Sequence, residues 1–174
     1  MLVQIPCMQR FSVYLGHPVY ALMVLLFSMI SATGVGSFFS ERLRIEERPA
    51  IARNIPLAIA AAILLLSFAI QPVIDLTIGW SLPARALMVV ALIGPVAFLL
   101  GLGFPTGMRL VRRVSPDSLA WMWGINGAAS VFAAVLSIVV SMAWGIHANL
   151  YAAVLLYGTL ALVTPVLWRR GESG

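Results

Sequence analysis

Long apolar runs separated by short polar segments dominate the chain. The hydrocarbon core of a bilayer, about 30 Å thick, is crossed by roughly 20 apolar residues in a helix, because each residue advances a helix by about 1.5 Å. Five runs have this length, and we predict a membrane span in each: 18–39, 55–74, 86–104, 121–144 and 150–168. The pattern predicts an all-α fold, a polytopic transmembrane helix bundle of five full spans.

The first sixteen residues differ from these runs. They include two glutamines, a proline and an arginine, and are too short and too polar to span a membrane alone. They also lack the charged start, long apolar middle and cleavage site of a signal peptide. We expect residues 1–16 to be the tail of a preceding helix whose beginning is missing, which makes the chain a fragment. Residues 17–170 then form the bundle, and residues 171–174 form a cytoplasmic tail.

Composition agrees with a membrane environment. Hydrophobic residues make up 61% of the chain and charged residues only 10%, whereas about a quarter of a soluble domain is charged. The net charge of +5 comes from eleven arginines without any lysine. In a soluble protein this balance would suggest nucleic acid. Here the arginines cluster between the spans, so we expect the lipid bilayer as partner and no nucleic acid.

The arginines also predict an orientation. If the five spans alternate, Arg10 and Arg85 fall on one side of the membrane and the other nine fall on the opposite side. Positively charged loops are retained in the cytoplasm. We therefore expect the arginine-rich loops and the C-terminus inside, in a bacterial inner membrane. The nine are Arg42, Arg44, Arg48, Arg53, Arg109, Arg112, Arg113, Arg169 and Arg170.

Two series of small residues, each spaced four apart, predict helix packing. Helices in lipid associate by close packing, and such spacing lets two backbones approach. The alternative is a narrow substrate path, which would normally also have polar groups at mid-depth. The series are Ser28, Ala32, Gly36 and Ser40 in the first span, and Ala129, Ala133, Ser137, Ser141 and Gly145 in the fourth.

Local signals mark helix breaks and ends. Gly94-Pro95 interrupts the middle of the third span, and the glycines and proline of residues 101–107 loosen its cytoplasmic end. Such breaks line a cavity or produce a simple kink. Ser115-Pro116 has the order of a helix start and fixes where the fourth span begins. The pattern of the first loop, residues 41–54, predicts a short solvated helix that ends near Pro49, and a lipid-headgroup or partner site is the alternative.

Catalytic and cofactor chemistry has no candidate in the sequence. All six acids lie outside the middle of the spans, so a proton path through a buried carboxylate has no residue here. Serine, histidine, cysteine and acidic residues show neither a catalytic pattern nor metal-ligand spacing. The glycine pairs at 34–36 and 101–103 lie inside helical runs, which does not favour nucleotide binding. The single Cys7 excludes an internal disulfide.

Three polar residues are candidates for a substrate contact or an interhelical contact. Asn126 lies about one turn inside the fourth span, where an interhelical hydrogen bond is the alternative to substrate. Arg109 reads either as an ordinary cytoplasmic anchor or as a contact for a partner domain or anionic headgroups. His17 lies at a predicted helix end.

Five short segments, in their order and spacing between Met8 and about Leu160, resemble the C-terminal membrane region of large bacterial spermidine synthase-like membrane proteins. The resemblance implies a multi-span region, likened to half of a major facilitator, joined to a soluble domain similar to aminopropyltransferases and methyltransferases. That domain would bring a Gly-rich cofactor loop and catalytic aspartates, and this sequence has neither. The segments are Met8-Gln9-Arg10-Phe11, Leu15-Gly16-His17-Pro18-Val19-Tyr20, Gly34-Val35-Gly36-Ser37, Phe104-Pro105-Thr106-Gly107 and Trp123-Gly124-Ile125-Asn126-Gly127-Ala128.

Three functional hypotheses follow. The first is a membrane module that anchors or serves the soluble domain, with that domain and the remaining helices on the same or a neighbouring polypeptide. The second is half of a transporter for a small organic cation or a lipid-like molecule. The third is a structural subunit that only packs against partner helices. A homo-oligomer stays open under each.

Overall fold

The structure is a computed structural model that describes the backbone of residues 1–43 and 49–172, and their side chains except at 49, 113, 114 and 166–172. Within these ranges it consists of helices joined by short connections, without a strand. Five helices are long and apolar enough to cross a membrane, which confirms the predicted all-α membrane bundle. The helices are α1 (Gln4–Tyr14), α2 (Pro18–Ser40), α3 (Pro49–Thr77), α4 (Leu82–Val114), α5 (Leu119–Trp144) and α6 (Ile146–Glu172), with short 3-10 turns η1 (Glu41–Leu43) and η3 (Pro116–Ser118).

Helices α3 and α4 extend beyond the apolar runs of the sequence. Helix α3 begins at Pro49, six residues before the predicted span, and α4 continues ten residues past Phe104. A helix leaves the hydrocarbon without unwinding, since its backbone hydrogen bonds are internal. Hydropathy therefore locates the part of each helix inside lipid rather than the whole helix.

The first loop is shorter than predicted. Residues 44–48, on which the predicted loop helix mostly falls, lie outside the described residues. Pro49 is the first residue of α3 rather than the end of a helix, a position that suits proline because the amide there has no helical partner. Arg53 and Asn54, predicted as loop, belong to α3.

The start of the fourth span lies close to Ser115-Pro116, with one correction. Pro116 opens the 3-10 turn η3, and the α-helix begins three residues later at Leu119. Ser115 does not cap a backbone amide with its side chain. Its hydroxyl instead lies 2.8 Å from the Ser118 hydroxyl.

Helix α4 remains continuous through Gly94-Pro95. Proline lacks the amide hydrogen, so one bond of the helical ladder is missing there, but the helix does not end. The predicted break is therefore a lost hydrogen bond within one long helix.

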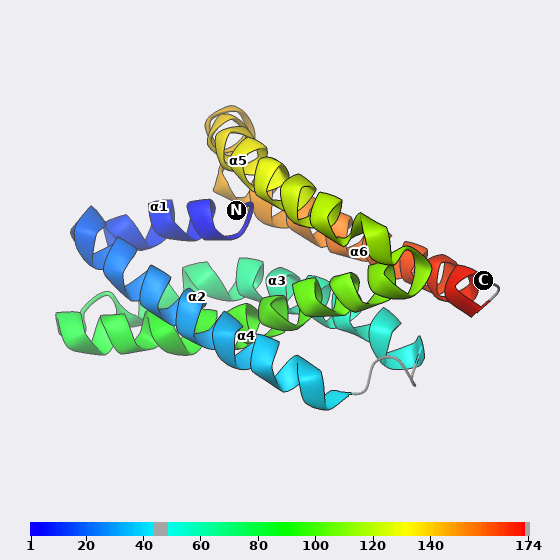
Figure 1. The fold of residues 1–174 in the computed structure, drawn as a ribbon. Helices are drawn as coiled ribbons and strands as arrows, with labels where there is room; N and C mark the ends of the chain where they lie inside the picture. The colour runs from blue at the N-terminus through cyan, green and yellow to red at the C-terminus, as the bar shows by residue number, and fades with distance from the viewer. Residues whose placement is uncertain (44–48, 173–174) are drawn as a thin grey trace.

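Helices α2 and α4 cross with their backbones in direct contact (Figure 1). A Cβ atom added at Gly36 would lie 2.1 Å from the Phe98 carbonyl oxygen, and one added at Gly101 would lie 2.3 Å from the Thr33 carbonyl oxygen. Any larger residue at either position would push the two helices apart.

Helix α1 packs inside the described bundle despite its polar residues. Pro6, Cys7, Phe11 and Tyr14 are buried, and the Tyr14 hydroxyl lies 2.6 Å from the Thr77 hydroxyl at the end of α3. With eleven residues, α1 is about 16 Å long, roughly half the thickness of a hydrocarbon core.

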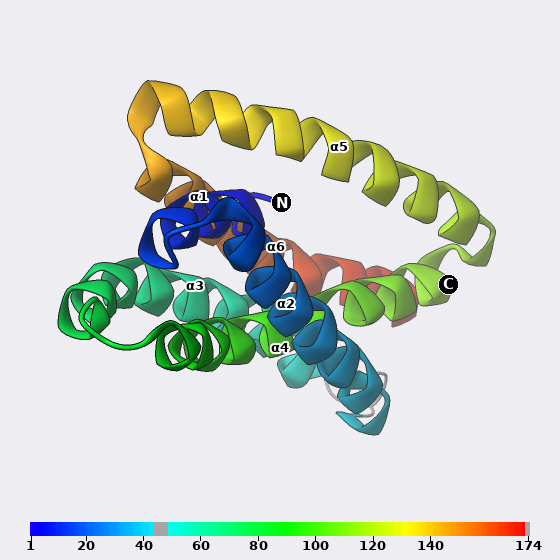
Figure 2. The same ribbon diagram turned by 90° about the vertical axis from the view of Figure 1, so that its left-hand side faces the viewer.

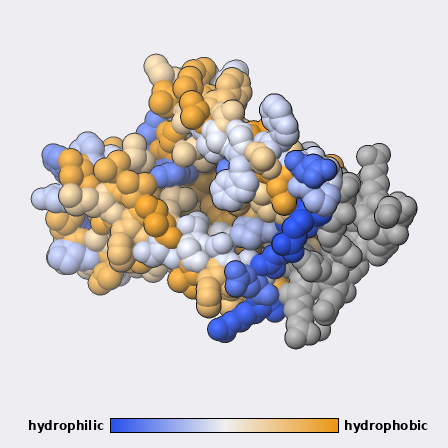
Figure 3. Space-filling view, in the orientation of Figure 1, coloured by the Kyte–Doolittle hydropathy of each residue, from blue (hydrophilic) through white to orange (hydrophobic). Residues whose placement is uncertain are grey.

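Helix α5 stands at the edge of the bundle (Figures 1 and 2). Only 6% of its most apolar stretch is buried inside the bundle. Side chains such as Trp121 and Met142 are 75% and 82% exposed. In water this surface would be unstable, whereas in a bilayer it faces lipid tails. The apolar patches of Figure 3 have the same explanation.

The glycine contact predicts a sharp difference between neighbouring positions of one helix. We expect Gly36→Ala to lower the stability of the chain by about 1–3 kcal/mol, the usual cost of overpacking, because the Phe98 backbone cannot move aside as a side chain would. Thermal unfolding of the purified protein in detergent measures the effect, and Gly101→Ala should behave in the same way.

Gly34→Ala is the matched control. A Cβ at Gly34 would have nothing within 4 Å, and alanine favours a helix over glycine by up to about 1 kcal/mol, so this variant should be as stable as the original or more so. Equal melting temperatures for the Gly36 and Gly34 variants would show that the contact between α2 and α4 does not stabilise the fold.

Candidate functional site

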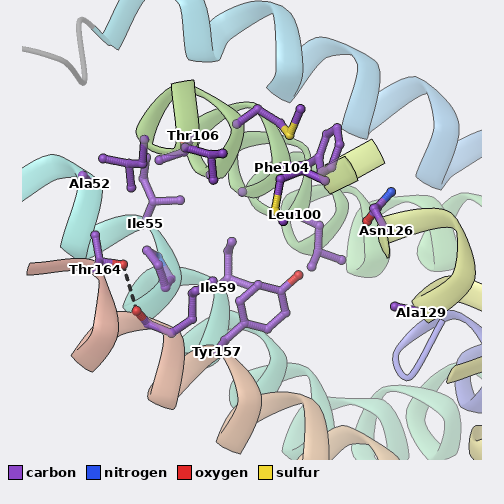
Figure 4. Close-up of a pocket in the computed structure, with 18 of the residues that line it drawn as sticks. Ala52, Ile55, Ile59, Leu100, Phe104, Thr106, Asn126, Ala129, Tyr157 and Thr164 are labelled. Atoms are coloured by element: carbon purple, nitrogen blue, oxygen red, sulfur yellow. Dashed lines mark hydrogen bonds between the residues drawn. The ribbon is translucent and has the colours of Figure 1, made fainter. Parts of the chain in front are cut away.

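A cavity of about 490 Å³ lies between α3, α4, α5 and α6 (Figure 4). Its size falls within the range of small-molecule sites, which are mostly apolar and carry a few polar groups. The described lining residues contain neither an acid nor a base. They are Ala52, Ile55, Pro56 and Ile59 of α3; Leu100, Gly103, Phe104, Thr106, Gly107, Met108, Leu110 and Val111 of α4; Met122, Ile125, Asn126 and Ala129 of α5; and Tyr157, Leu160 and Thr164 of α6.

Small residues of α4 and α5 leave room for the cavity. Gly103 and Gly107 are four apart, so they share one face of α4, and Ala129 lines the cavity from α5. A Cβ at Gly107 would have nothing within 4 Å, whereas one at Gly103 would come 3.2 Å from the Ile59 side chain. Of the three glycines predicted to loosen the end of the third span, Gly103 and Gly107 therefore lie on a cavity wall, whereas Gly101 packs against α2.

Two threonines in the cavity wall use their hydroxyls locally. Thr106 donates to the Leu102 carbonyl at 2.6 Å, and Thr164 donates to the Leu160 carbonyl at 2.8 Å. Such bonds to the preceding turn satisfy the hydroxyl within its own helix. They leave these threonines little capacity to donate to a ligand.

Asn126 and Tyr157 supply the remaining polar groups of the cavity. The Asn126 backbone carbonyl accepts from Ser130, while the side-chain amide has no hydrogen bond among the described residues. The Tyr157 ring projects between Ile59 and Ala129 in Figure 4, with its hydroxyl facing the open space. Both side chains are neutral donors and acceptors, so the cavity can orient a polar head without neutralising a charge.

Two segments that carry the family resemblance meet at this cavity. Phe104, Thr106 and Gly107 come from the segment at residues 104–107, and Asn126 comes from the segment at residues 123–128. The rings of Phe104 and Trp123 also touch edge to face, with centroids 4.8 Å apart. The contact joins α4 to the first turns of α5 at the rim of the cavity.

Arg109 makes an interhelical contact. Its guanidinium donates to the Ser40 carbonyl at 2.8 Å, at the last residue of α2. The last carbonyls of a helix have no partner inside the helix, and a cation at that end also interacts favourably with the helix dipole. The side chain of Arg109 is thus directed to α2.

His17 caps a helix. Its Nδ1 accepts from the Val19 amide at 3.2 Å at the start of α2, and its ring packs near Tyr20, with centroids 5.6 Å apart. Gly16 precedes it at φ +79°, a conformation that glycine adopts without strain. This cap gives the polar His17 side chain a hydrogen-bond partner within its own helix.

The small-residue series of α2 faces inward. Ser28, Gly36 and Ser40 are buried and Ala32 is partly buried, and α4 is the helix they face at the Gly36 contact. In α5 the series divides. Ser137 is buried, its neighbours Ala133 and Ser141 are partly buried, and the two ends, Ala129 and Gly145, are exposed.

Asn149, which the sequence reasoning missed, joins α5 to α6. Its amide donates to the Ser137 carbonyl at 2.9 Å and to the Ser141 hydroxyl at 2.7 Å. The side chain is fully buried, and such interhelical bonds hold membrane helices together. The fifth apolar run predicts a span that begins at Leu150, which leaves Asn149 in the connection before it.

A second polar contact joins α1 to α6. The guanidinium of Arg10 lies 3.2 Å from the His147 Nε2 atom. His147 does not belong to a metal site: within the described ranges, no three His, Cys, Asp or Glu residues lie close enough together to hold a metal ion.

Comparisons with protein-family models, with curated proteins and with solved structures give no match to this chain.

Proposed function

We propose that the chain is an integral membrane module that binds a lipid-like molecule between α3, α4, α5 and α6. The observation that supports this proposal is the cavity of about 490 Å³ with an apolar wall and two neutral polar side chains. Lining residues such as Ile125 and Leu160 are exposed, so the cavity is open to its surroundings. A molecule dissolved in the bilayer can therefore reach the cavity without crossing water.

The chemistry of the wall favours a lipid-like ligand over an organic cation. Binding a cation away from water requires an anionic partner or an aromatic cage, because desolvating a charge is costly. The described lining residues include no acid and two aromatic side chains, Phe104 and Tyr157. A polyamine would lose its hydration there without a compensating ion pair.

We further propose that this module serves a soluble domain of the aminopropyltransferase or methyltransferase kind. The support is the sequence resemblance, two segments of which line the same cavity. A catalytic domain beside the membrane would then act on, or be held near, the molecule in the cavity. The chain itself would supply binding and anchoring.

Transport is the weaker proposal. A transporter site is expected near the midplane with access to both sides in turn. The described lining residues of α3, α4 and α5 instead lie on one half of their helices, for example residues 100–111 of the long helix α4. Binding from one leaflet accounts for this position without further assumptions.

Filling the cavity tests the proposed binding. We expect Ala129→Phe to weaken binding of pyrene-labelled phosphatidylcholine at least about tenfold, because overpacking costs about 1–3 kcal/mol and 1.4 kcal/mol corresponds to a tenfold change. Energy transfer from the tryptophans to pyrene in detergent measures the binding.

Ala143→Phe is the matched control, since Ala143 is exposed on the same helix and is absent from the described lining. It should bind the labelled lipid as the original chain does. If both variants bind equally well, the cavity is not the binding site.

The orientation, with the arginine-rich loops and the C-terminus in the cytoplasm of a bacterium, is also a proposal. We expect Gly79→Cys, in the connection between α3 and α4, to react with an impermeant maleimide from outside intact cells. Asp117→Cys, at the opposite ends of the helices, should react only after permeabilisation. Both are introduced after Cys7→Ser, and the reverse pattern would invert the topology.

A further inference from the structure

The two neutral polar side chains of the cavity lie deep in their helices. Tyr157 comes eleven residues after Ile146, the first residue of a span of 20 residues, which places it about 16 Å along a span of about 30 Å. Asn126 comes seven residues after Leu119, the start of α5, about 10 Å along that helix. Lipid headgroups lie outside the hydrocarbon core. Tyr157 in particular therefore lies near mid-span, well below the level of the headgroups.

Neither group has a partner among the residues that the structure describes. The Asn126 amide and the Tyr157 hydroxyl line the cavity without a hydrogen bond to another described side chain or carbonyl. The two threonines of the wall differ, because their hydroxyls are satisfied within their own helices. An unpaired polar group costs free energy in an apolar environment. The two groups therefore favour a ligand that brings hydrogen-bonding atoms into the cavity.

The two groups face the open space from different helices. Figure 4 shows Asn126 on the α5 side and Tyr157 on the α6 side, with the phenol hydroxyl toward the open space. Both an amide NH2 group and a phenol hydroxyl donate hydrogen bonds. A ligand head with an acceptor oxygen on each of two opposite sides can therefore bond to both helices at once.

The wall of the cavity also suits a flat ring. Two aromatic side chains, Phe104 and Tyr157, and two methionines, Met108 and Met122, line it. Aromatic rings pack favourably against other rings, and thioether sulfur atoms make favourable contacts with ring edges. Methionine also adapts its shape to an irregular neighbour. These side chains favour a planar head over a bare hydrocarbon chain.

We propose that the cavity binds a quinone-type lipid, which is a neutral flat ring with two opposite carbonyl oxygens and a hydrocarbon tail. The Asn126 amide donates to one carbonyl and the Tyr157 hydroxyl donates to the other. The tail follows the apolar wall toward the bilayer. The inference rests on the proposed function and names the ligand class of the same site.

A phospholipid can place only an acyl chain at this depth. Its phosphate would have to leave water, and the described lining residues include no cation to replace that hydration. The acyl chain would also leave Asn126 and Tyr157 unpaired. A labelled phospholipid can thus occupy the cavity and report on its volume, whereas a quinone makes two hydrogen bonds that the phospholipid lacks.

Titration with two matched compounds tests the proposal. The full chain in detergent is titrated with decyl-dimethylbenzoquinone and with decyl-dimethylbenzene, which has the same ring substituents and tail but no oxygen. Native mass spectrometry measures the bound compound. We expect the quinone to bind at least about tenfold more tightly, in line with two hydrogen bonds between neutral groups.

Tyr157→Phe and Asn126→Leu each remove one hydrogen-bonding group and keep a side chain of similar size. Each variant should weaken quinone binding about fivefold and leave binding of decyl-dimethylbenzene unchanged, because only the quinone accepts a hydrogen bond. Unchanged binding of the hydrocarbon also shows that the variant is folded. Tyr151→Phe is the matched control, since Tyr151 is exposed on the same helix and is absent from the described lining. It should bind the quinone as the original chain does.

The outcomes separate this inference from the proposed function. Equal binding of the quinone and the hydrocarbon, with loss of both in Ala129→Phe, would overturn the quinone site and leave the lipid cavity standing. Equal binding with no effect of Ala129→Phe would overturn both. Decanol that binds as tightly as the quinone would show that a single hydroxyl is enough, which also overturns the inference.

Discussion

The backbone contact between α2 and α4 is the constraint on which the rest of the described structure depends. Lipid tails are as apolar as the helices, so membrane helices associate by close packing rather than by escape from water. Gly36 and Gly101 bring two main chains together with no room for a Cβ atom. Once α2 is fixed on α4 in this way, the ends of both helices have defined partners.

Helix α4 uses an arginine at each end to hold a neighbouring helix. Arg85 donates to the Tyr14 carbonyl at the end of α1, at 2.7 Å, and Arg109 donates to the Ser40 carbonyl at the end of α2. The two arginines are 24 positions apart, about 36 Å along a helix, which slightly exceeds the hydrocarbon thickness. Each guanidinium can thus satisfy an orphan carbonyl at the end of a neighbouring helix.

Hydropathy alone predicted the helical class and the five membrane spans, because the cost of leaving backbone groups unpaired in lipid permits little else. The helix partners were less predictable. The spacing of Ser28, Ala32, Gly36 and Ser40 identifies a smooth face but not the helix that meets it, and Gly101 lies 65 positions away from Gly36. The sequence did not single out Asn149, because it lies just before a predicted span. It did not single out Tyr157, because this residue adds only one hydroxyl group to an apolar run.

The cavity follows from the unequal use of the two faces of α4. Gly101 and Gly103 are two positions apart, so they point in nearly opposite directions. The first is closed against α2 by direct backbone contact, while Gly103 and Gly107 face the space below α5. Helix α5 is joined to its neighbours near its ends, by the ring contact of Trp123 and by the bonds from Asn149. A helix held at two points over a glycine face leaves a gap between them, and the apolar wall of that gap disfavours ordered water.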